Sequence, residues 1–398
     1  MLRATRNRSL GLAVGVLVVV VVSVSAATHA GSSPTSPTST ATSTSTTPAP
    51  PPPGATRLAD LPTTAVAPRI AADGDVAAWS TASSISVVTG DGPVQTFATP
   101  SRPRGLSVGH VDGQPPVVVF ALCPPGKHGS KRRHGSCDLY RLSRLDASGT
   151  VVPLTDVGPG LSAAGASTGS ADELSPSLAG RFLVFARWPK GKVPGYLVRR
   201  DLRTGHERRL PSGSRGECHH DCSWDGVYAN GPTQAAASGN AYAQIWTFFG
   251  GPDGFGVDDN DVAIKGRLTG RPRDHIVDET FVDGAGDGGA FIDDLKLAGG
   301  VVQVTNDIYD PDDAPPKPGT HLDLLRTTGK HYSTYDDPVG RRIVSAAATP
   351  TTLWLVLEAQ ALPAGTSDDD MPEDVCGATV HGCVVERMPA PAFVPGRD

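Results

Sequence analysis

Residues 174–210 read LSPSLAGRFLVFARWPKGKVPGYLVRRDLRTGHERRL, and this stretch decides the fold. An apolar run at 182–186 follows a turn at Gly180, and a second run at 196–202 ends in Thr204-Gly205. β-Branched and aromatic residues that alternate with charged ones fit a half-buried pleated surface. The stretch therefore predicts two antiparallel strands, a turn, and a short third strand that ends at Leu210.

The same unit recurs along the chain. A turn that ends in glycine closes each unit, and the glycines lie 59, 56, 65 and 59 residues apart, at Gly90, Gly149, Gly205, Gly270 and Gly329. A pair of apolar runs precedes each turn, and a sixth pair occupies 353–357 and 384–388. Small sheets with an apolar face cannot stand alone, and stacking them radially leaves only short edges. We therefore expect an all-β, six-bladed β-propeller; the alternative is one or two β-sandwiches with accidental spacing.

One pair of motifs resembles the TolB-like family of six-bladed propellers, which is also described as WD40-like. The matching segments are Ser175-Pro176-Ser177-Leu178-Ala179-Gly180, which corresponds to the family's Ser-Pro-Asp-Gly turn, and Asp201-Leu202-Arg203-Thr204-Gly205. The resemblance covers about residues 55–398 and implies a binding platform. The N-terminal α/β domain of the protein that gives the family its name is not expected here.

Ring closure gives a further expectation. The sixth outer strand would fall on 389–395, where several prolines lack the N–H group that a strand ladder needs. Residues 55–58 look like the end of an outer strand. We therefore expect this N-terminal segment to complete the last blade, so that both chain ends lie in one sheet.

The N-terminal residues predict export. Residues 1–30 carry three arginines ahead of an apolar run at 10–24, which is typical of a signal peptide or an uncleaved membrane anchor. Residues 31–54 consist almost wholly of Ser, Thr, Pro and Ala and predict a disordered linker. Residues 55–398 would then form the propeller outside the cytoplasm, either secreted or held at the membrane by the N-terminal segment.

Composition and charge restrict the function classes. The formal net charge of -6 gives no electrostatic footprint for nucleic acid, so no nucleic-acid partner is expected. The six cysteines form three close pairs in sequence, and an oxidising compartment favours disulfides between neighbours. The expected pairs are Cys123 with Cys137, Cys218 with Cys222, and Cys376 with Cys383. All three bridges would then lie on one side of the disc.

Acidic residues cluster in the predicted insertions of blades four to six, whereas lysines and arginines occupy those of blades two and three. Such a divided face could steer a partner, although charge runs also simply keep loops solvated. The candidate binding residues are Trp224, Asp310, Asp312, Asp313, Asp368, Asp369 and Asp370. The oxygen ligands of Asp258, Asp259 and Asp261 suit Ca²⁺, but their spacing is not that of an EF-hand. Zinc or copper at Cys218–Cys222 is the less favoured alternative to a disulfide.

No catalytic residue is assigned from the sequence. The segment 165–169 matches G-x-S-x-G but lacks the flanking strand and helix of a nucleophile elbow. We expect an exported, envelope-associated propeller that is monomeric and that binds a protein or a glycan. No catalysis is expected, and Ca²⁺ is the one cofactor that the residues suggest. The alternatives are a propeller lyase or hydrolase with an acidic, metal-dependent site at the channel mouth, and an inert structural component of the envelope.

Overall fold

The structure is a computed structural model that describes residues 48–64, 67–110, 116–123, 137–142, 151–153, 171–189, 196–210, 228–238, 241–250, 257–267, 289–298, 301–309, 321–326, 331–361 and 375–395. The chain divides into two compact units, Met1–Ser45 and Thr46–Asp398, and every described residue belongs to the second. Within this part of the chain, no helix is long and apolar enough to cross a membrane. The predicted signal or anchor segment lies outside it, so that prediction stays a prediction.

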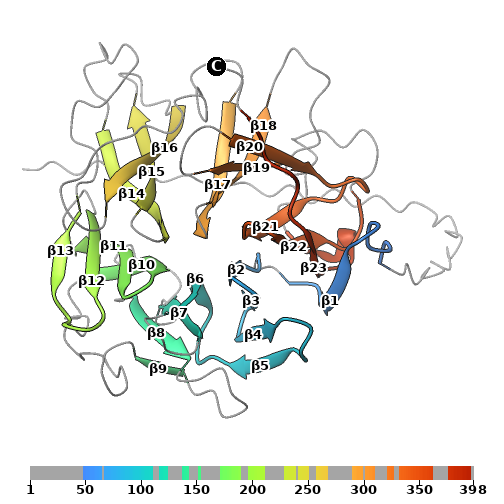
Figure 1. The fold of residues 1–398 in the computed structure, drawn as a ribbon, viewed down its shortest axis with the longest axis horizontal. Coiled ribbons are helices and arrows are strands. Elements are labelled where there is room, and N and C mark those ends of the chain that lie inside the picture. The colour runs from blue at the N-terminus through green and yellow to red at the C-terminus, as the bar shows by residue number, and fades with distance from the viewer. Residues whose placement is uncertain are drawn as a thin grey trace, which may run out of the picture. The chain divides into compact units, whose positions relative to one another are not determined.

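The described residues form six antiparallel sheets, which follow one another along the chain and surround a common centre (Figure 1). Each sheet contacts the next, and β2 of the first contacts β21 of the sixth, so the ring is closed. The fold is therefore a β-propeller, as the repeat predicted, and the sandwich alternative is wrong. Blade 1 has β2 (Ile70–Asp73), β3 (Val76–Ser80), β4 (Ser84–Thr89) and β5 (Gln95–Ala98). Blade 2 has β6 (Pro103–His110), β7 (Pro116–Leu122), β8 (Asp138–Leu142) and β9 (Val151–Pro153). Blade 3 has β10 (Ala171–Ala179), β11 (Phe182–Pro189), β12 (Tyr196–Asp201) and β13 (Glu207–Arg209).

The other three blades are less uniform in strand number. Blade 4 has β14 (Tyr228–Ser238), β15 (Ala241–Gly250) and β16 (Val257–Arg267) among the described residues. Blade 5 has β17 (Gly289–Ala298), β18 (Val301–Tyr309), β19 (His321–Arg326), β20 (His331–Asp336) and β24 (Val394–Pro395). Blade 6 has β21 (Ile343–Ala348), β22 (Thr352–Glu358) and β23 (Cys383–Pro389), together with β1 (Thr56–Leu61), and the 3-10 helix η3 (Ala378–Val380) precedes β23.

The motif that resembles the TolB-like family lies differently from the expectation. Ser175, Pro176 and Ser177 belong to the inner strand β10, and the turn is confined to Gly180 and Arg181. The reason is a bulge, because the pairing register between β10 and β11 shifts between Leu174 and Ser177. The Ser-Pro pair therefore marks a bulged strand instead of a turn.

Apolar clusters fill the spaces between neighbouring blades. Trp79 of β3 and Trp354 of β22 are fully buried in one cluster between blades 1 and 6. Phe185 of β11 packs against Val119 and Leu139 in the cluster between blades 2 and 3. Trp79 and Trp354 therefore pack blade 1 against blade 6. Sheet-to-sheet burial of this kind is what allows sheets that cannot fold alone to be stable together.

Three buried serines, which we call the serine belt, join the inner strands of neighbouring blades. The hydroxyl of Ser107 accepts a hydrogen bond from the N–H of Leu178 at 2.9 Å, and that of Ser345 accepts one from Ile70 at 3.1 Å. Ser177 accepts from the N–H of Ala237 at 2.7 Å. Each serine lies at or just after a register shift in its own strand. The shift directs the hydroxyl toward the next blade, which is a common use of a β-bulge.

Replacing Ser177 with alanine should destabilise the ring, since it leaves the buried N–H of Ala237 without its acceptor. We expect the free energy of unfolding to fall by about 1–3 kcal/mol. Urea denaturation of the full chain measures this change. Ser83→Ala is the matched control, because Ser83 is exposed in the turn before β4. An equal effect of the two substitutions would contradict a structural role for the belt.

The N-terminal strand closes the ring, as the sequence predicted. β1 pairs antiparallel with β23, from Thr56 opposite Arg387 to Leu61 opposite Cys383, and so forms the outer strand of blade 6. The turn before β23 fits closely against β1, because a Cβ on Gly382 would lie 2.4 Å from the carbonyl oxygen of Leu61. The expectation that both chain ends lie in one sheet is wrong, however. The C-terminal β24 pairs with β20 of blade 5 instead.

A buried network of charges supports this closure. The guanidinium group of Arg341 is completely buried and donates to Asp337 at 2.8 Å and to Glu386 at 2.9 Å. Arg57 of β1 contacts the same Glu386 at 3.3 Å. Asp337 follows the last long strand of blade 5, Glu386 lies in blade 6, and Arg57 comes from the N-terminal segment. The network thus joins the N-terminal strand β1 to blade 6 and to the end of blade 5. Removing one partner would leave a buried charge unpaired, which is energetically costly.

A chain that lacks residues 1–61 should be less stable than one that lacks only residues 1–45. The longer deletion removes β1 and the buried side chain of Leu61, and it deprives Glu386 of Arg57. We expect a loss of more than about 2 kcal/mol, measured by urea denaturation. Equal stability of the two shortened chains would show that β1 does not hold the ring.

Candidate functional site

All seven sequence-predicted binding residues lie outside the described part of the chain: Trp224, Asp310, Asp312, Asp313, Asp368, Asp369 and Asp370. Their role stays a prediction. Asp258, Asp259 and Asp261 lie in β16, where they pair with Phe249, Phe248 and Trp246 of β15. They are therefore part of a strand instead of the loop insertion that the sequence indicated. Where the structure describes side chains, no group of three His, Cys, Asp or Glu residues is arranged to hold a metal ion.

Two of the three predicted disulfides are present, and the pair Cys218 and Cys222 lies outside the described residues. Cys123–Cys137 closes the connection between β7 and β8, and Cys376–Cys383 closes that between β22 and β23. Both bridges thus occupy the connection from a second to a third strand. In an antiparallel blade this connection emerges on the same side as the start of the inner strand.

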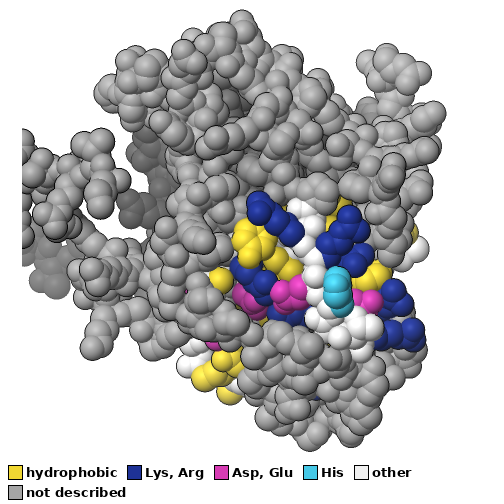
Figure 2. Space-filling view, turned by 90° about the vertical axis from the view of Figure 1, so that its left-hand side faces the viewer, with side chains coloured by type: hydrophobic (Ala, Val, Ile, Leu, Met, Phe, Trp, Pro, Cys, Tyr) yellow, Lys and Arg dark blue, Asp and Glu magenta, His cyan; other side chains and the backbone are white. Residues whose placement is uncertain are grey.

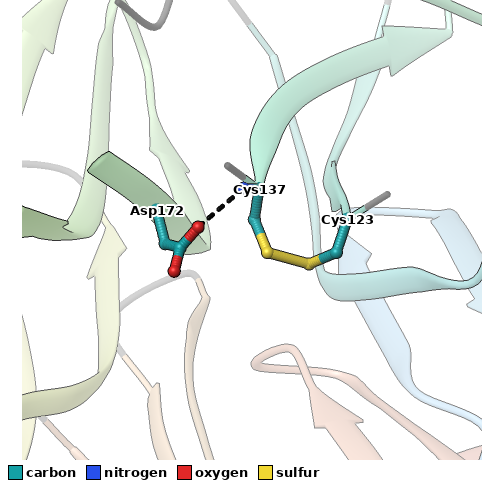
Figure 3. The surroundings of a disulfide bond; sticks show 3 residues. All are labelled: Cys123, Cys137 and Asp172. Carbon is teal, nitrogen blue, oxygen red and sulfur yellow. Dashed lines mark hydrogen bonds between the residues drawn. A yellow bond between two sulfur atoms is a disulfide. The ribbon is translucent and has the colours of Figure 1, made fainter. Parts of the chain in front are cut away.

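The first disulfide is tied to the next blade (Figure 3). The N–H of Cys137 donates to the carboxylate of Asp172 at 2.8 Å, and the N–H of Glu173 donates to the carbonyl of Cys137 at 2.8 Å. Asp172 and Glu173 begin the inner strand β10. The bridge therefore fixes the position of blade 3 as well as the loop of blade 2.

Four charged side chains cross blade 3 from its inner to its outer strand. Each strand contributes one residue of this charge network: Glu173, Arg187, Arg200 and Glu207. Arg187 donates to Glu173 at 2.5 Å and to Glu207 at 2.6 Å, and Arg200 donates to Glu207 at 2.6 Å. Both guanidinium groups lie 5.1 Å from the centre of the Phe185 ring. The two cations and two anions balance one another, so the network is a structural element.

The carboxyl groups of this network titrate differently. Burial raises the pKa of Glu173, although hydrogen bonding and charge from Arg187 and Arg200 oppose the shift. Burial also acts to raise the pKa of Glu207, but the hydrogen bonds from the same two arginines outweigh it and lower that pKa. Glu207 therefore stays ionised and holds both arginines in place.

The outer strands of blade 3 present an excess of positive charge. The described residues of this blade include seven arginines and four acidic residues, although the whole chain has a formal net charge of -6. Figure 2 looks toward the outer strands of this blade and shows more Lys and Arg side chains than Asp and Glu side chains among the coloured residues. The arginines outside the charge network form what we call the arginine surface: Arg181, Arg199, Arg203, Arg208 and Arg209.

This surface was not predicted as a candidate site from the sequence. The sequence pattern places the basic residues of blades two and three in insertions, and those insertions lie outside the described residues. The signal was present in the stretch quoted first, where five arginines occur between Tyr196 and Leu210. What the sequence could not show was which of these arginines are neutralised by Glu173 and Glu207.

Glu358 is a second buried acid, and it lies beside the second disulfide. It ends β22, pairs with Cys383 and is completely buried. Among the described residues, neither carboxyl oxygen has a hydrogen-bond partner within ordinary geometry. Burial raises the pKa of Glu358, and the charge of Arg342 and the backbone of Cys376 offset this only in part. A carboxyl group in such a place favours its neutral form.

The raised pKa of Glu358 predicts a specific pH dependence. Because its pKa is raised on folding, the protonated carboxyl group of Glu358 stabilises the folded state at pH values below its ordinary pKa of about 4.5. This stabilisation is lost as the pH rises through the folded-state pKa. Glu358→Gln should therefore gain stability relative to the wild type as pH rises, as measured by urea denaturation at several pH values. Glu207→Gln is the control of opposite sign, because the pKa of Glu207 is lowered and its contribution is lost as pH falls.

The comparisons with known proteins identify no family for this chain. No family model matches the chain, and no curated protein matches it. A protein of unknown function from Dyadobacter fermentans is 9% identical, with a TM-score of 0.43, and the match covers 85% of this chain and 100% of that one. TolB from Acinetobacter baumannii is 13% identical, with a TM-score of 0.36, over 80% of this chain and 65% of that one. The Pyrococcus horikoshii acylaminoacyl peptidase is 12% identical, with a TM-score of 0.37, over 73% of this chain and 41% of that one.

The class of protein is therefore set by the sheets and their ring: the chain is a β-propeller protein. Membership of the TolB-like family does not follow, because the identities are low and no family model matches. The chain spans about two fifths of the peptidase's length and just under two thirds of TolB's. Neither the activity of the one nor the role of the other transfers to this chain on such a likeness.

Proposed function

We propose that this protein is an extracytoplasmic, envelope-associated β-propeller that acts as a non-catalytic binding module for a protein or a glycan. The observation that carries the proposal is the arginine surface of blade 3. Three of its cations stand on the regular strands β12 and β13, and the other two lie in the turns at Arg181 and Arg203. A balanced charge network holds β12 and β13 to the rest of the blade. A rigid charged surface of this kind suits recognition of an oppositely charged partner.

The proposed compartment has separate support. Disulfides persist in oxidising environments, and the two described bridges close connections of neighbouring strands. The apolar run at 10–24 and the Pro-rich and Ser-rich segment that follows it fit export and a spacer. Together these features favour a propeller displayed outside the cytoplasm.

The proposal predicts that binding to envelope material depends on the arginine surface. Co-sedimentation of the purified full chain with isolated envelope fractions measures the binding. The variant in which Arg203 and Arg209 are both replaced by glutamine should bind about tenfold more weakly, since two charge-assisted contacts are lost. Binding should also weaken at high salt, because exposed charges are screened. Binding that ignores both the salt and the substitutions would overturn the proposal.

A further inference from the structure

The outer strand of blade 1 is an open edge in a continuously described part of the chain. The structure describes residues 67–110 without a break, and all four strands of this blade lie within that range. The last of them, β5, pairs with β4 on one side and lies at the outer end of its sheet (Figure 1). The properties of this edge can therefore be read from the blade itself.

The backbone groups on the open side of β5 have no partner within the described residues. The N–H of Thr99 donates to the carbonyl of Ser83 at 2.8 Å, toward the β4 side. Inward and outward groups alternate along an antiparallel strand, so the N–H and carbonyl groups of Thr96 and Ala98 point away from β4. Among the described residues, no backbone hydrogen bond reaches these outward groups. They are available to pair with another strand.

The β5 edge also lacks the usual protection against such pairing. Soluble proteins protect edge strands with charged residues, proline or bulges. The sequence of β5 is Gln-Thr-Phe-Ala, and its pairing with β4 shows no register shift. Each of the other outer strands that the structure describes has such a feature: Arg57, Asp60 and a register shift in β1, Pro153 in β9, Glu207, Arg208 and Arg209 in β13, Asp258, Asp259 and Asp261 in β16, and Pro395 in β24.

The side chains on one face of this edge are exposed and uncharged. Phe97 is buried in the cluster between blades 1 and 2, whereas Thr96 and Ala98 are exposed on the opposite face. Val94, which directly precedes β5, is 37% exposed and is one of two exposed large hydrophobic residues in the described part of the chain. The edge thus combines open backbone groups with a small apolar surface.

We propose that β5 pairs antiparallel with β5 of a second copy of this chain, with Thr96 at the two-fold axis. In this register Thr96 of one copy lies opposite Thr96 of the other, and Val94 lies opposite Ala98. The outward backbone groups of these residues then exchange hydrogen bonds across the axis. A pair of threonines directly opposite each other stabilises a sheet, and Ala98 of the second copy covers the exposed Val94.

The absence of charge favours a second copy over the strand of another protein. A two-fold axis places identical residues opposite each other, so a charged residue at the centre would repel its own copy. Thr96 and the residues on either side of it are neutral. The four-residue length of β5 also suits a partner strand of the same length. This pairing replaces the monomer that we expected from the sequence, and it does not depend on the arginine surface of blade 3.

The test measures self-association by titrating a fluorescently labelled full chain with unlabelled copies. Thr96→Lys places two like charges at the axis, so this variant should associate with itself at least about tenfold more weakly than the wild type. Thr96→Glu should show the same loss. A mixture of labelled Thr96→Lys with unlabelled Thr96→Glu places opposite charges there, and it should restore association to within about threefold of the wild type.

Two control variants separate the effect of charge at the axis from other effects. Thr56→Lys adds the same charge at an exposed position of β1, the outer strand of blade 6, and should associate as the wild type does. Ser86→Ala removes the 2.9 Å hydrogen bond between the hydroxyl groups of Ser86 and Thr96 but adds no charge. It should associate within about twofold of the wild type.

The remaining outcomes count against the inference. A wild type that stays monomeric at every concentration would overturn it. Equal association of the like-charged and the oppositely charged variants would also overturn it, because the copies would then be joined through another part of the chain. A monomeric wild type whose binding to envelope fractions is lost in Thr96→Lys would assign the β5 edge to a strand of another protein instead.

Discussion

The inner strands of neighbouring blades must approach one another closely without leaving buried backbone groups unsatisfied. At the junction of blades 2 and 3 the approach is so close that a Cβ on Gly109 would lie 2.7 Å from the Cβ of Leu178. Bulges at this radius interrupt the regular ladders, and the serine belt supplies acceptors for the N–H groups of the next blade. An unsatisfied buried N–H would cost more than the hydrogen bond itself contributes. The spacing of the ring therefore depends on small residues with a hydroxyl group or no side chain.

Charge is used in two distinct ways in this ring. Around Arg341 and around Arg187, every buried cation is matched by carboxylates. The first network joins elements that are distant in sequence, whereas the second joins the consecutive strands of blade 3. On the outer strands of blade 3 the cations exceed the anions and stand at the surface. Buried pairs stabilise because removing one partner is costly, whereas an unbalanced surface costs some stability and gains a capacity to bind.

The sequence predicted the architecture because the fold is built from local repeats. Turn glycines about sixty residues apart, together with paired apolar runs, were enough to predict a ring of sheets. The prolines after Met388 indicated that the last blade takes its outer strand from another part of the chain. The prediction that both chain ends lie in one sheet was wrong. Two residues of β24 pair with β20 of blade 5, and so short a strand leaves no recognisable pattern in the sequence. The Ser-Pro segment was assigned to a turn, since a bulge and a turn use similar residues.

The candidate surface was harder to predict than the fold. Arg187, Arg199, Arg200 and Arg208 look alike in the sequence, and only the register shows that Arg199 faces Arg208 while Arg200 faces Glu207. Serine is common in loops, so nothing marked Ser107, Ser177 and Ser345 as a set before their hydrogen bonds were known.

The pairing of β1 with β23 also constrains how the chain can fold. Thr56 is made 331 residues before its partner Arg387, so blade 6 stays incomplete until the strands of the other five blades have been made, apart from β24. Contacts between such distant parts of a chain form slowly, because a long loop must close before they contribute. Until then β23 has an unpaired edge and β1 is an unprotected strand, and both are open to pairing with other molecules. The chain therefore has most need of a chaperone in the interval before β1 and β23 pair.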